Sequence, residues 1–553
     1  MTPESLGTTI QEALEALSAS GVLTSDEPLP KPTVERPRNR EHGDYATNVA
    51  MVLAKRAAMP PRDLAGAIAE QLRTNAEIES VDIAGPGFIN ITLATAAQGV
   101  VAQQIIEQGQ DYGRSDLLAG TSFNVEFISA NPTGPLHLGH TRWAAVGDAL
   151  VKVLAAAGGQ VSGEFYVNDR GTQMDKFGLS IANAAEGKPP PEDGYHGAYV
   201  VELAAEITAD HPEYAQLTGA DRLKAYREAG YQRQLRQQQQ VLDIFRTHFD
   251  VWTSERELHD SGAVEAGLDR LREQGHVYEA DGALWLRTTT FGDDKDRVLI
   301  KAGGELTYFA SDTAYYIDKR RRGFDVCIYL LGADHHGYVG RLRAVAACAG
   351  DDPDVNIEIP IGQLVKMMKG GEEVRLSKRA GNMVTLEDLV DEVGVDAARY
   401  QLIRYPVDSP LTLDLDQLIK RSNDNPVYYV QYAHARISAV LRNAADLGID
   451  WRALPLDPGL LGEPAESTLL GVLAEFPRVV AGAAELREPH RVARYLENLA
   501  TAYHKFYDSC RVLPRGDEQP DETSIARLWL CGATRQVLAN GLALCGVSAP
   551  ERM

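Results

Sequence analysis

The spacing of hydrophobic residues changes period several times along the chain and divides it into regions. Residues 123–128 form an apolar, strand-like segment, residues 143–154 follow with a helical period, and residues 164–167 form a second strand-like segment. Strand, turn, helix and strand in this order make up one half of a doubly wound nucleotide-binding fold. A further apolar segment at 326–331 is typical of a buried parallel strand. We therefore predict an α/β protein whose central domain is a Rossmann-type, doubly wound parallel sheet.

The regions around this central domain have patterns of their own. Residues 1–110 combine helical periods with short alternating segments, which predicts a small N-terminal α+β domain. The central domain is expected at 111–360, interrupted by an insertion around 173–300 where the pattern is long, polar and helical. Residues 361–425 are expected to form a connector. Residues 426–553 contain only long amphipathic helical periods, which predicts an all-α C-terminal domain.

Composition narrows the class of protein. The 553 residues carry a net charge of −23. Residues 426–553 have 13 Lys and Arg against 15 Asp and Glu, so most of the acidic excess lies in residues 1–425. The net charge therefore does not exclude a nucleic-acid partner, which could bind a less acidic part of the surface. No stretch of eighteen apolar residues occurs, and the N-terminus lacks the regions of a signal peptide, so we expect a cytoplasmic protein that does not enter a membrane. The five cysteines show no Cys-x-x-Cys spacing and no protein-bound metal is expected.

The turn at 130–140 carries the candidate chemistry. Its prolines and glycines fix a tight turn after the first strand of the central domain, and ligands of open parallel sheets bind at that edge. Two histidines lie where the next helix begins, close to free backbone N–H groups that suit phosphates. A His-x-Gly-His match of this kind also occurs by chance in ordinary loops. The residues expected to contact a nucleotide here are Pro132, Gly134, His137, Gly139 and His140.

A second segment, Arg375-Leu376-Ser377-Lys378-Arg379, by itself reads as a solvated basic turn. Taken together, the two segments resemble the His-Ile-Gly-His and Lys-Met-Ser-Lys-Ser signatures of class I aminoacyl-tRNA synthetases. The longer stretches 130–140 and 334–338 resemble arginyl-tRNA synthetases of the bacterial type, and this resemblance covers nearly the whole chain. The second signature departs from the family at three positions, which are Arg375, Leu376 and Arg379.

The resemblance implies an ATP-dependent arginine–tRNA ligase. Such an enzyme activates L-arginine to arginyl-adenylate with release of pyrophosphate, and then transfers the arginine to the 3′ end of its arginine-specific tRNA. Mg²⁺ is expected to arrive with ATP, held by phosphates and water. The implied catalytic residues are His137, His140, Ser377 and Lys378. Further implied ATP contacts are Asp334, His335, His336, Arg375 and Lys378.

The resemblance also implies a pocket for the arginine substrate. The matching residues are Glu126, Asn131, Tyr308 and Asp312. We expect Asp312 to accept two hydrogen bonds from the guanidinium, with the ammonium end near Glu126. Two alternatives remain open from the residues alone: Asp312 as a helix N-cap, and Glu126 as half of an internal salt bridge.

Contacts with tRNA are implied at both ends of the chain. In the N-terminal domain Phe88 could stack on a base and Asn90 could bind its edge; the alternatives are a core side chain and a turn. Residues 231–242 of the insertion are rich in Gln and Arg, a composition more typical of a solvated helix face than of a tRNA contact. The C-terminal candidates are Tyr428, Tyr432, Arg436, Tyr503 and Tyr507, although aromatic residues at this helical spacing are more often core residues.

Two other functions fit parts of the pattern. A class I-like ligase could pass its activated amino acid to a small acceptor, but the N-terminal and long helical C-terminal regions argue against it. A non-catalytic RNA-binding paralogue would not need His137, His140 and Lys378. We expect a monomer that binds tRNA, arginine and ATP.

Overall fold

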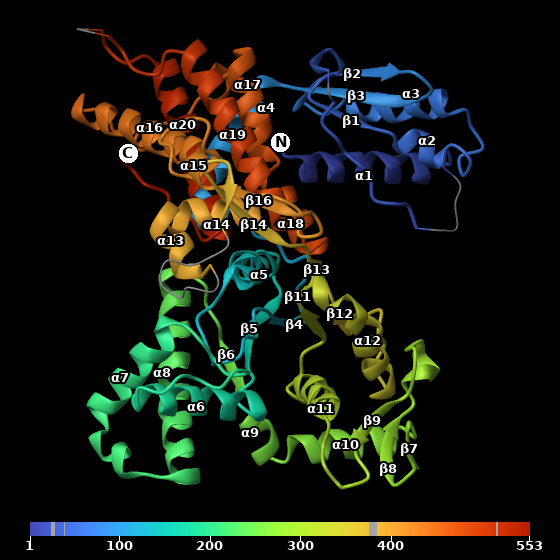
Figure 1. Ribbon diagram of the computed structural model, residues 1–553. Helices are drawn as coiled ribbons and strands as arrows, with labels where there is room; N and C mark the ends of the chain where they lie inside the picture. The colour runs from blue at the N-terminus through green and yellow to red at the C-terminus, as the bar shows by residue number, and fades with distance from the viewer. Residues whose placement is uncertain (24–27, 38, 375–383, 516–517) are drawn as a thin grey trace.

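The computed structural model describes residues 1–23, 28–37, 39–374, 384–515 and 518–553. Figure 1 shows the N-terminal domain beside the C-terminal helices at one end of the molecule, with the central sheet below them and helices α6–α8 at the opposite end.

The central domain is built on a five-stranded sheet of order β12-β10-β4-β5-β6, and all of its pairs are parallel. Numbered along the chain from the β6 edge, this is the 3-2-1-4-5 order of a Rossmann sheet, so the predicted fold class is confirmed. The order reverses between β4 and β10, and ligands of such sheets bind at the carboxyl ends of those strands. The strands are β4 (Ser122–Glu126), β5 (Gln160–Val167), β6 (Val251–Ser254), β10 (Val326–Tyr329) and β12 (Ile357–Glu358).

Strand β4 lies in the middle of the sheet and is covered on both faces. Phe123, Val125 and Phe127 are buried against helix α5, which connects β4 to β5. The strand ends two residues earlier than predicted, because Ile128 and Ser129 have left-handed φ angles of 70° and 47° and turn the chain out of the sheet. Helices around the sheet are α5 (Leu138–Ala156), α11 (Tyr308–Arg321) and α12 (Val339–Cys348).

The predicted insertion at 173–300 is two separate segments, because β6 lies within that range and belongs to the central sheet. The first segment is helical, with α6 (Thr172–Ala185), α7 (Ala198–Asp210) and α8 (Gly219–Ile244). The second contains α9 (Glu255–Asp260), α10 (Ala263–Glu273), and the antiparallel strands β7 (Val277–Ala280), β8 (Ala283–Leu286) and β9 (Arg297–Ile300).

The N-terminal domain has its own hydrophobic core. It packs α1 (Pro3–Ala19), α2 (Val49–Leu53) and α3 (Pro61–Leu72) with an antiparallel sheet of β1 (Tyr45–Thr47), β2 (Ile78–Ala84) and β3 (Phe88–Leu93). Helix α4 (Thr95–Gln108), expected within this domain, packs instead against the C-terminal helices α17 (Pro464–Ala474) and α20 (Glu522–Leu544).

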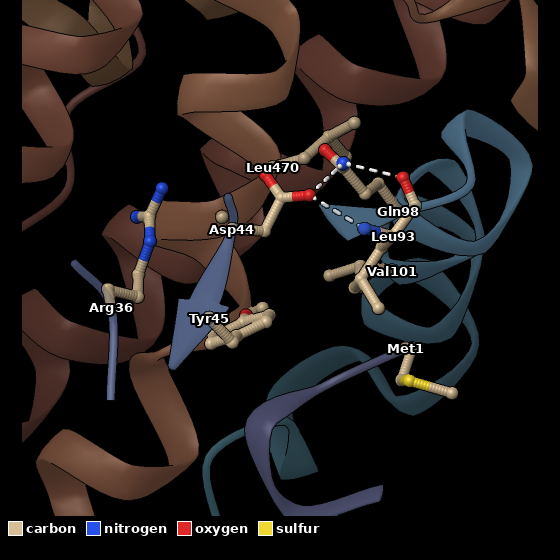
Figure 2. Close-up of a pocket in the computed structure, with 10 residues that line it drawn as sticks. Met1, Arg36, Asp44, Tyr45, Leu93, Gln98, Val101 and Leu470 are labelled. Atoms are coloured by element: carbon tan, nitrogen blue, oxygen red, sulfur yellow. Dashed lines mark hydrogen bonds between the residues drawn. The ribbon is translucent and has the colours of Figure 1, made fainter. Parts of the chain in front are cut away.

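Polar contacts fix the N-terminal domain to its neighbours around a small pocket (Figure 2). The Asp44 carboxylate accepts hydrogen bonds from the Leu93 backbone N–H and from the Gln98 side chain, both at 2.9 Å. Gln98 belongs to α4, and Leu470 of α17 lines the same pocket. On the C-terminal side, Arg478 donates to a backbone carbonyl of the N-terminal domain.

The connector and the C-terminal domain complete the fold. The connector contains β13 (Ile361–Gly362), which pairs with β11 (Leu331–Gly332), and a sheet of β14 (Val365–Lys369), β15 (Glu372–Glu373) and β16 (Leu411–Asp414). Its helices are α13 (Leu386–Val393), α14 (Val395–Ile403) and α15 (Leu415–Leu418). The C-terminal domain is helical, as predicted, with α16 (Pro426–Asp446), α17 (Pro464–Ala474), α18 (Phe476–Glu485), α19 (His490–Ser509) and α20 (Glu522–Leu544).

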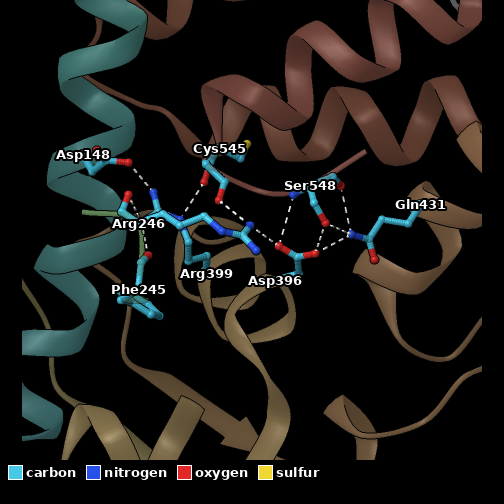
Figure 3. A network of polar contacts seen from close by, with 9 residues as sticks. Asp148, Phe245, Arg246, Asp396, Arg399, Gln431, Cys545 and Ser548 are labelled. Carbon is cyan, nitrogen blue, oxygen red and sulfur yellow. Dashed lines mark hydrogen bonds and ion pairs between the residues drawn. The ribbon is translucent and has the colours of Figure 1, made fainter. Parts of the chain in front are cut away.

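A buried ion pair joins these parts to α5 (Figure 3). Arg399 of α14 is fully buried and pairs with Asp148 of α5. Its guanidinium also donates to the carbonyl oxygens of Phe245 (2.8 Å) and Cys545 (3.1 Å), which follow α8 and α20. Four distant stretches of chain are therefore held at one arginine, next to the helix that begins at the candidate site.

One stretch of the described chain, Pro464–Glu485, is apolar and long enough to cross a membrane by composition alone. It comprises α17 and α18, and half of the tested window is buried inside the fold. Core helices of globular proteins pass the same test, so this is weak evidence for a membrane segment.

Candidate active site

The two signature histidines lie at the N-terminus of α5, as predicted. His137 is the N-cap: its Nδ1 accepts a hydrogen bond from the Gly139 backbone N–H at 3.1 Å. The His137 backbone N–H in turn donates to Nδ1 of His140 at 3.3 Å, and the two ring centroids are 3.9 Å apart. A Cβ atom at Gly139 would lie 2.9 Å from the His137 ring, so any other residue there would push that ring away from its cap position.

These contacts fix the chemical state of both rings. Burial lowers the pKa of His137, and burial together with its neighbour lowers the pKa of His140 to about 3, so both rings are neutral at physiological pH. Because each Nδ1 accepts a backbone hydrogen bond, the single ring proton is on Nε2. The site therefore presents two neutral Nε2–H donors at the positive end of a helix dipole, an arrangement suited to phosphate oxygens.

The chain just after the second signature is hydrogen-bonded to the turn that carries the first signature. Residues Arg375, Leu376, Ser377, Lys378 and Arg379 lie outside the described residues. The described chain resumes at Val384, whose carbonyl accepts from the Leu138 backbone N–H at 2.8 Å, while the Leu386 N–H donates to Leu136 at 2.8 Å. The segment that follows the second signature is thus bound directly to the first.

The third predicted nucleotide contact follows β10, on the other side of the point where the strand order reverses. Asp334, His335 and His336 belong to the 3-10 turn Ala333–Tyr338 and are exposed. His335 Nε2 lies 3.4 Å from an Asp334 carboxylate oxygen. In the described residues no group of three or more His, Cys, Asp or Glu side chains could hold a metal ion.

Carboxylates cluster where the arginine substrate is predicted to bind, with Glu126 and Glu255 buried and Asp312 half-buried. Asp312 is on the second turn of α11, and the N-cap of that helix is Thr307, so the alternative of Asp312 as a cap is wrong. Burial, and less strongly repulsion from Glu126, raise the pKa of Asp312 to about 6, although a hydrogen bond from the Tyr338 hydroxyl opposes the shift. Burial and repulsion from Asp312 also raise the pKa of Glu255 to about 7. Raised pKa values of this origin indicate negative charge that a bound cation would stabilise.

Glu126 does form an internal salt bridge, as one alternative held. Its Oε2 lies 2.5 Å from Nζ of the fully buried Lys319, and its Oε1 accepts from Ser129 Oγ at 2.9 Å. Lys319 also lies over two tyrosine rings, Tyr315 at 4.3 Å and Tyr329 at 3.9 Å from the centroids. A substrate ammonium that binds Glu126 would therefore meet a carboxylate whose charge is already partly neutralised by Lys319.

The other two pocket residues are accessible. Tyr308 is 66% exposed. Its hydroxyl lies close to the backbone of Gly171: a Cβ atom added at Gly171 would be 3.1 Å from the hydroxyl oxygen. The Asn131 side chain donates to the Gln173 amide oxygen. Tyr308 therefore reaches solvent and Asn131 is half-buried, so neither belongs to the core.

In the N-terminal domain, Phe88 and Asn90 share one face of β3, two residues apart. Phe88 is 41% exposed, so the alternative of a core side chain is wrong. Asn90 is buried in mid-strand between Ala46 and Asp82, so it does not close a turn.

The C-terminal candidates form an aromatic surface patch, with one exception. Tyr428 and Tyr432 stack with centroids 6.1 Å apart, and the Arg436 guanidinium lies 3.9 Å from the ring centroid of Tyr507. Tyr503 is fully buried, so the expectation that it offers a stacking face is wrong. Tyr503 and Tyr507 are one helical turn apart, and the packing of α19 on its neighbours buries the first ring fully and the second only in part.

Sequence reasoning missed two residues at the site. Gln238 of α8 is buried, not solvated, and binds the signature turn. Glu255, the first residue of α9, interacts electrostatically with Asp312 and so belongs to the same cluster of carboxylates. Neither has a motif around it: a Gln-rich helix and a helix-opening glutamate both usually face solvent.

Comparisons with known proteins identify the family of each part of the chain. Three family models match the chain: the arginyl tRNA synthetase N terminal domain at residues 4–93, the catalytic domain of tRNA synthetases class I (R) at 102–192 and 218–419, and the DALR anticodon binding domain at 430–553. The chain is 55% identical to the arginine–tRNA ligase of Frankia alni over 553 residues, and 54% identical to that of Kineococcus radiotolerans over 556 residues, with 100% of each chain covered.

A solved structure shows the same fold. The Thermus thermophilus arginyl-tRNA synthetase superposes with a TM-score of 0.75 at 22% identity, covering 100% of both chains. Sequence matches along the full length, with matches to all three family models, go beyond a shared fold. The chain therefore belongs to the arginyl-tRNA synthetase family of class I tRNA synthetases.

Proposed function

We propose that the protein is an arginine–tRNA ligase that activates L-arginine with Mg²⁺-bound ATP and transfers it to the 3′ end of its cognate tRNA. The observation that carries this proposal is that two neutral Nε2–H donors follow β4 and that a cluster of three interacting carboxylates, Glu126, Asp312 and Glu255, includes the last residue of that strand. The donors suit the phosphates of ATP, and the carboxylates suit a substrate with a guanidinium and an ammonium group.

Activation is an in-line attack of the arginine carboxylate on the α-phosphate, with pyrophosphate leaving. His137 and His140 donate to phosphate oxygens as charge moves toward the leaving group, and their neutral state allows this without proton transfer. Pro132, Gly134 and Gly139 bring the backbone close to the nucleotide. Mg²⁺ is part of the substrate and neutralises the phosphates, so this chain need supply no metal site of its own.

The second signature acts on the leaving pyrophosphate. Lys378 supplies a point charge, Arg375 keeps the charge of the first signature position, and Ser377 supplies a hydroxyl. Support comes from the hydrogen bonds that tie Val384 and Leu386, just after this segment, to the start of α5. Asp334, His335 and His336 are proposed to line the adenosine side.

Arginine is proposed to bind with its guanidinium on Asp312 and beside Tyr308. Its ammonium would lie near Asn131 and near Glu126, whose charge is shared with Lys319. A planar, two-donor guanidinium matches a carboxylate better than the single ammonium of lysine, which accounts for selectivity.

The tRNA is proposed to contact both ends of the chain. Phe88 is an exposed ring on the N-terminal domain with Asn90 on the same strand face. The C-terminal patch offers Tyr428, Tyr432, Arg436 and Tyr507 for stacking and phosphate contact. A monomer located in the cytoplasm is the simplest form consistent with these roles.

Charging of total tRNA with each labelled amino acid tests the proposal. Arginine alone should be transferred, and transfer should require ATP and Mg²⁺. A transfer to small amines but not to tRNA would favour a ligase with a small acceptor. Absence of ATP–pyrophosphate exchange, measured with tRNA present, would favour a non-catalytic paralogue. His140→Ala should reduce exchange by about a hundredfold or more, as loss of an oxyanion-type donor does.

A further inference from the structure

Side chains from the first inserted segment bind the backbone of the signature turn. Nε2 of Gln238 on α8 donates to the carbonyl oxygens of Asn131 at 3.0 Å and Gly134 at 2.8 Å. The Tyr199 hydroxyl on α7 donates to the carbonyl oxygen of Thr133 at 3.1 Å. Three of four consecutive carbonyls are therefore held by helices more than 60 residues away along the chain.

The signature turn has few hydrogen bonds of its own to stabilise its conformation. Pro132 and Pro135 lack N–H groups, and within the described residues no backbone N–H donates to the carbonyls of Thr133 and Gly134. The chain enters the turn through Ile128 and Ser129 with φ angles of 70° and 47°, a conformation that is costly for a β-branched residue. Strained backbone of this kind persists only where its surroundings hold it.

The amide of Gln238 makes hydrogen bonds to the signature turn and contributes little else to the structure. The side chain is 1% exposed, and its Oε1 makes no hydrogen bond to the described part of the chain. A buried amide with one unsatisfied atom costs stability, so an apolar residue would suit the core better. The two donated bonds to the turn are what the amide contributes.

We propose that Gln238 and Tyr199 are positioning residues for the turn that carries His137 and His140, so that α7 and α8 are part of the catalytic apparatus. This inference rests on the proposed function of the histidines. The two side chains fix the carbonyls of residues 131–134 and thereby the point from which α5 and its histidine cap begin. Movement of α7 or α8 would be transmitted to the donors that face the phosphates.

The test is Gln238→Met, which keeps the length of the side chain and removes its two donors. The matched control is Gln234→Met, one turn earlier on α8, because Gln234 is 0% exposed and its amide donates only within the helix, to Gln237 at 3.0 Å. We expect Gln238→Met to lower kcat of ATP–pyrophosphate exchange about tenfold to a hundredfold, the effect of losing two hydrogen bonds. The KM for ATP should change less than threefold or so, because the donors act mainly on charge that develops in the transition state.

Tyr199→Phe serves as a second variant that removes a single hydroxyl. Its kcat should fall by about fivefold, with a melting temperature close to that of the parent. The inference is overturned if both variants keep the parent kcat, or if Gln234→Met lowers kcat as much as Gln238→Met does. His140→Ala distinguishes a failure of the positioning role from a failure of the proposed function. If His140→Ala loses ATP–pyrophosphate exchange and Gln238→Met keeps it, only the positioning role is wrong. If His140→Ala keeps exchange, the proposed function of the turn is wrong.

Discussion

Replacement of Asp312 by asparagine is expected to stabilise the fold while removing arginine recognition. The pKa of this carboxyl is raised to about 6 from 3.8, mainly by burial. At about 1.4 kcal/mol per pH unit, keeping Asp312 ionised costs the folded state about 3 kcal/mol at neutral pH. The amide carries no charge and has nearly the same shape. This figure already includes the hydrogen bond from the Tyr338 hydroxyl, which favours the ionised form and opposes the shift.

The pH dependence follows from the sign of the shift. A carboxyl whose pKa is higher in the folded than in the unfolded state destabilises the fold as it ionises, so the cost is absent below about pH 4 and complete above pH 6. The variant should melt higher than the parent at pH 7.5, and this difference should be about half as large at pH 5. The charged and titratable groups that set the shift besides Tyr338 are Glu126 and Arg341.

Arginine binding should move in the opposite direction. Loss of one partner of a buried charged pair costs about 2–5 kcal/mol, or roughly thirty-fold to several thousand-fold in affinity, whereas ATP affinity should stay close to that of the parent. Calorimetry and thermal melts on the same preparation measure both effects. Asp318→Asn is the control, since Asp318 lies on the same helix but pairs with Arg322 at 3.0 Å. An Asp312→Asn protein that binds arginine normally and melts lower would refute the reasoning.

Three further variants address other parts of the molecule. Lys378→Ala should lower the rate of activation much more than it weakens arginine binding, because its charge acts as pyrophosphate departs; a change confined to the KM for ATP would contradict this. Arg399→Met should lower the free energy of unfolding by about 3–5 kcal/mol, measured by chemical denaturation, because Asp148 is left buried with a weaker partner; unchanged stability would show that the pair contributes nothing. Phe88→Ala should raise the KM for tRNA about tenfold in charging assays and leave the KM for ATP unchanged, since base stacking on an aromatic ring contributes about 1–3 kcal/mol; an equal rise in both constants would exclude a specific tRNA contact.

The sequence by itself determined the features that depend on neighbouring residues. Hydrophobic period is a local property, so the strand, turn and helix around residues 123–156 could be predicted. The pair His137 and His140 could also be placed, because a cap and the third helical residue are always close together. The class of fold followed from the order of such elements, and the sheet order confirms it.

Only the tertiary structure decided which faces of those elements are covered, and by what. Glu126 and Lys319 are 193 positions apart, and Gln238 reaches a turn more than a hundred positions away, so no local pattern encodes either contact. A helical period likewise cannot tell fully buried Tyr503 from half-buried Tyr507. The physical reason is that burial and electrostatic interaction depend on distance in space, and the partner that covers a side chain or supplies its charge comes from another part of the chain.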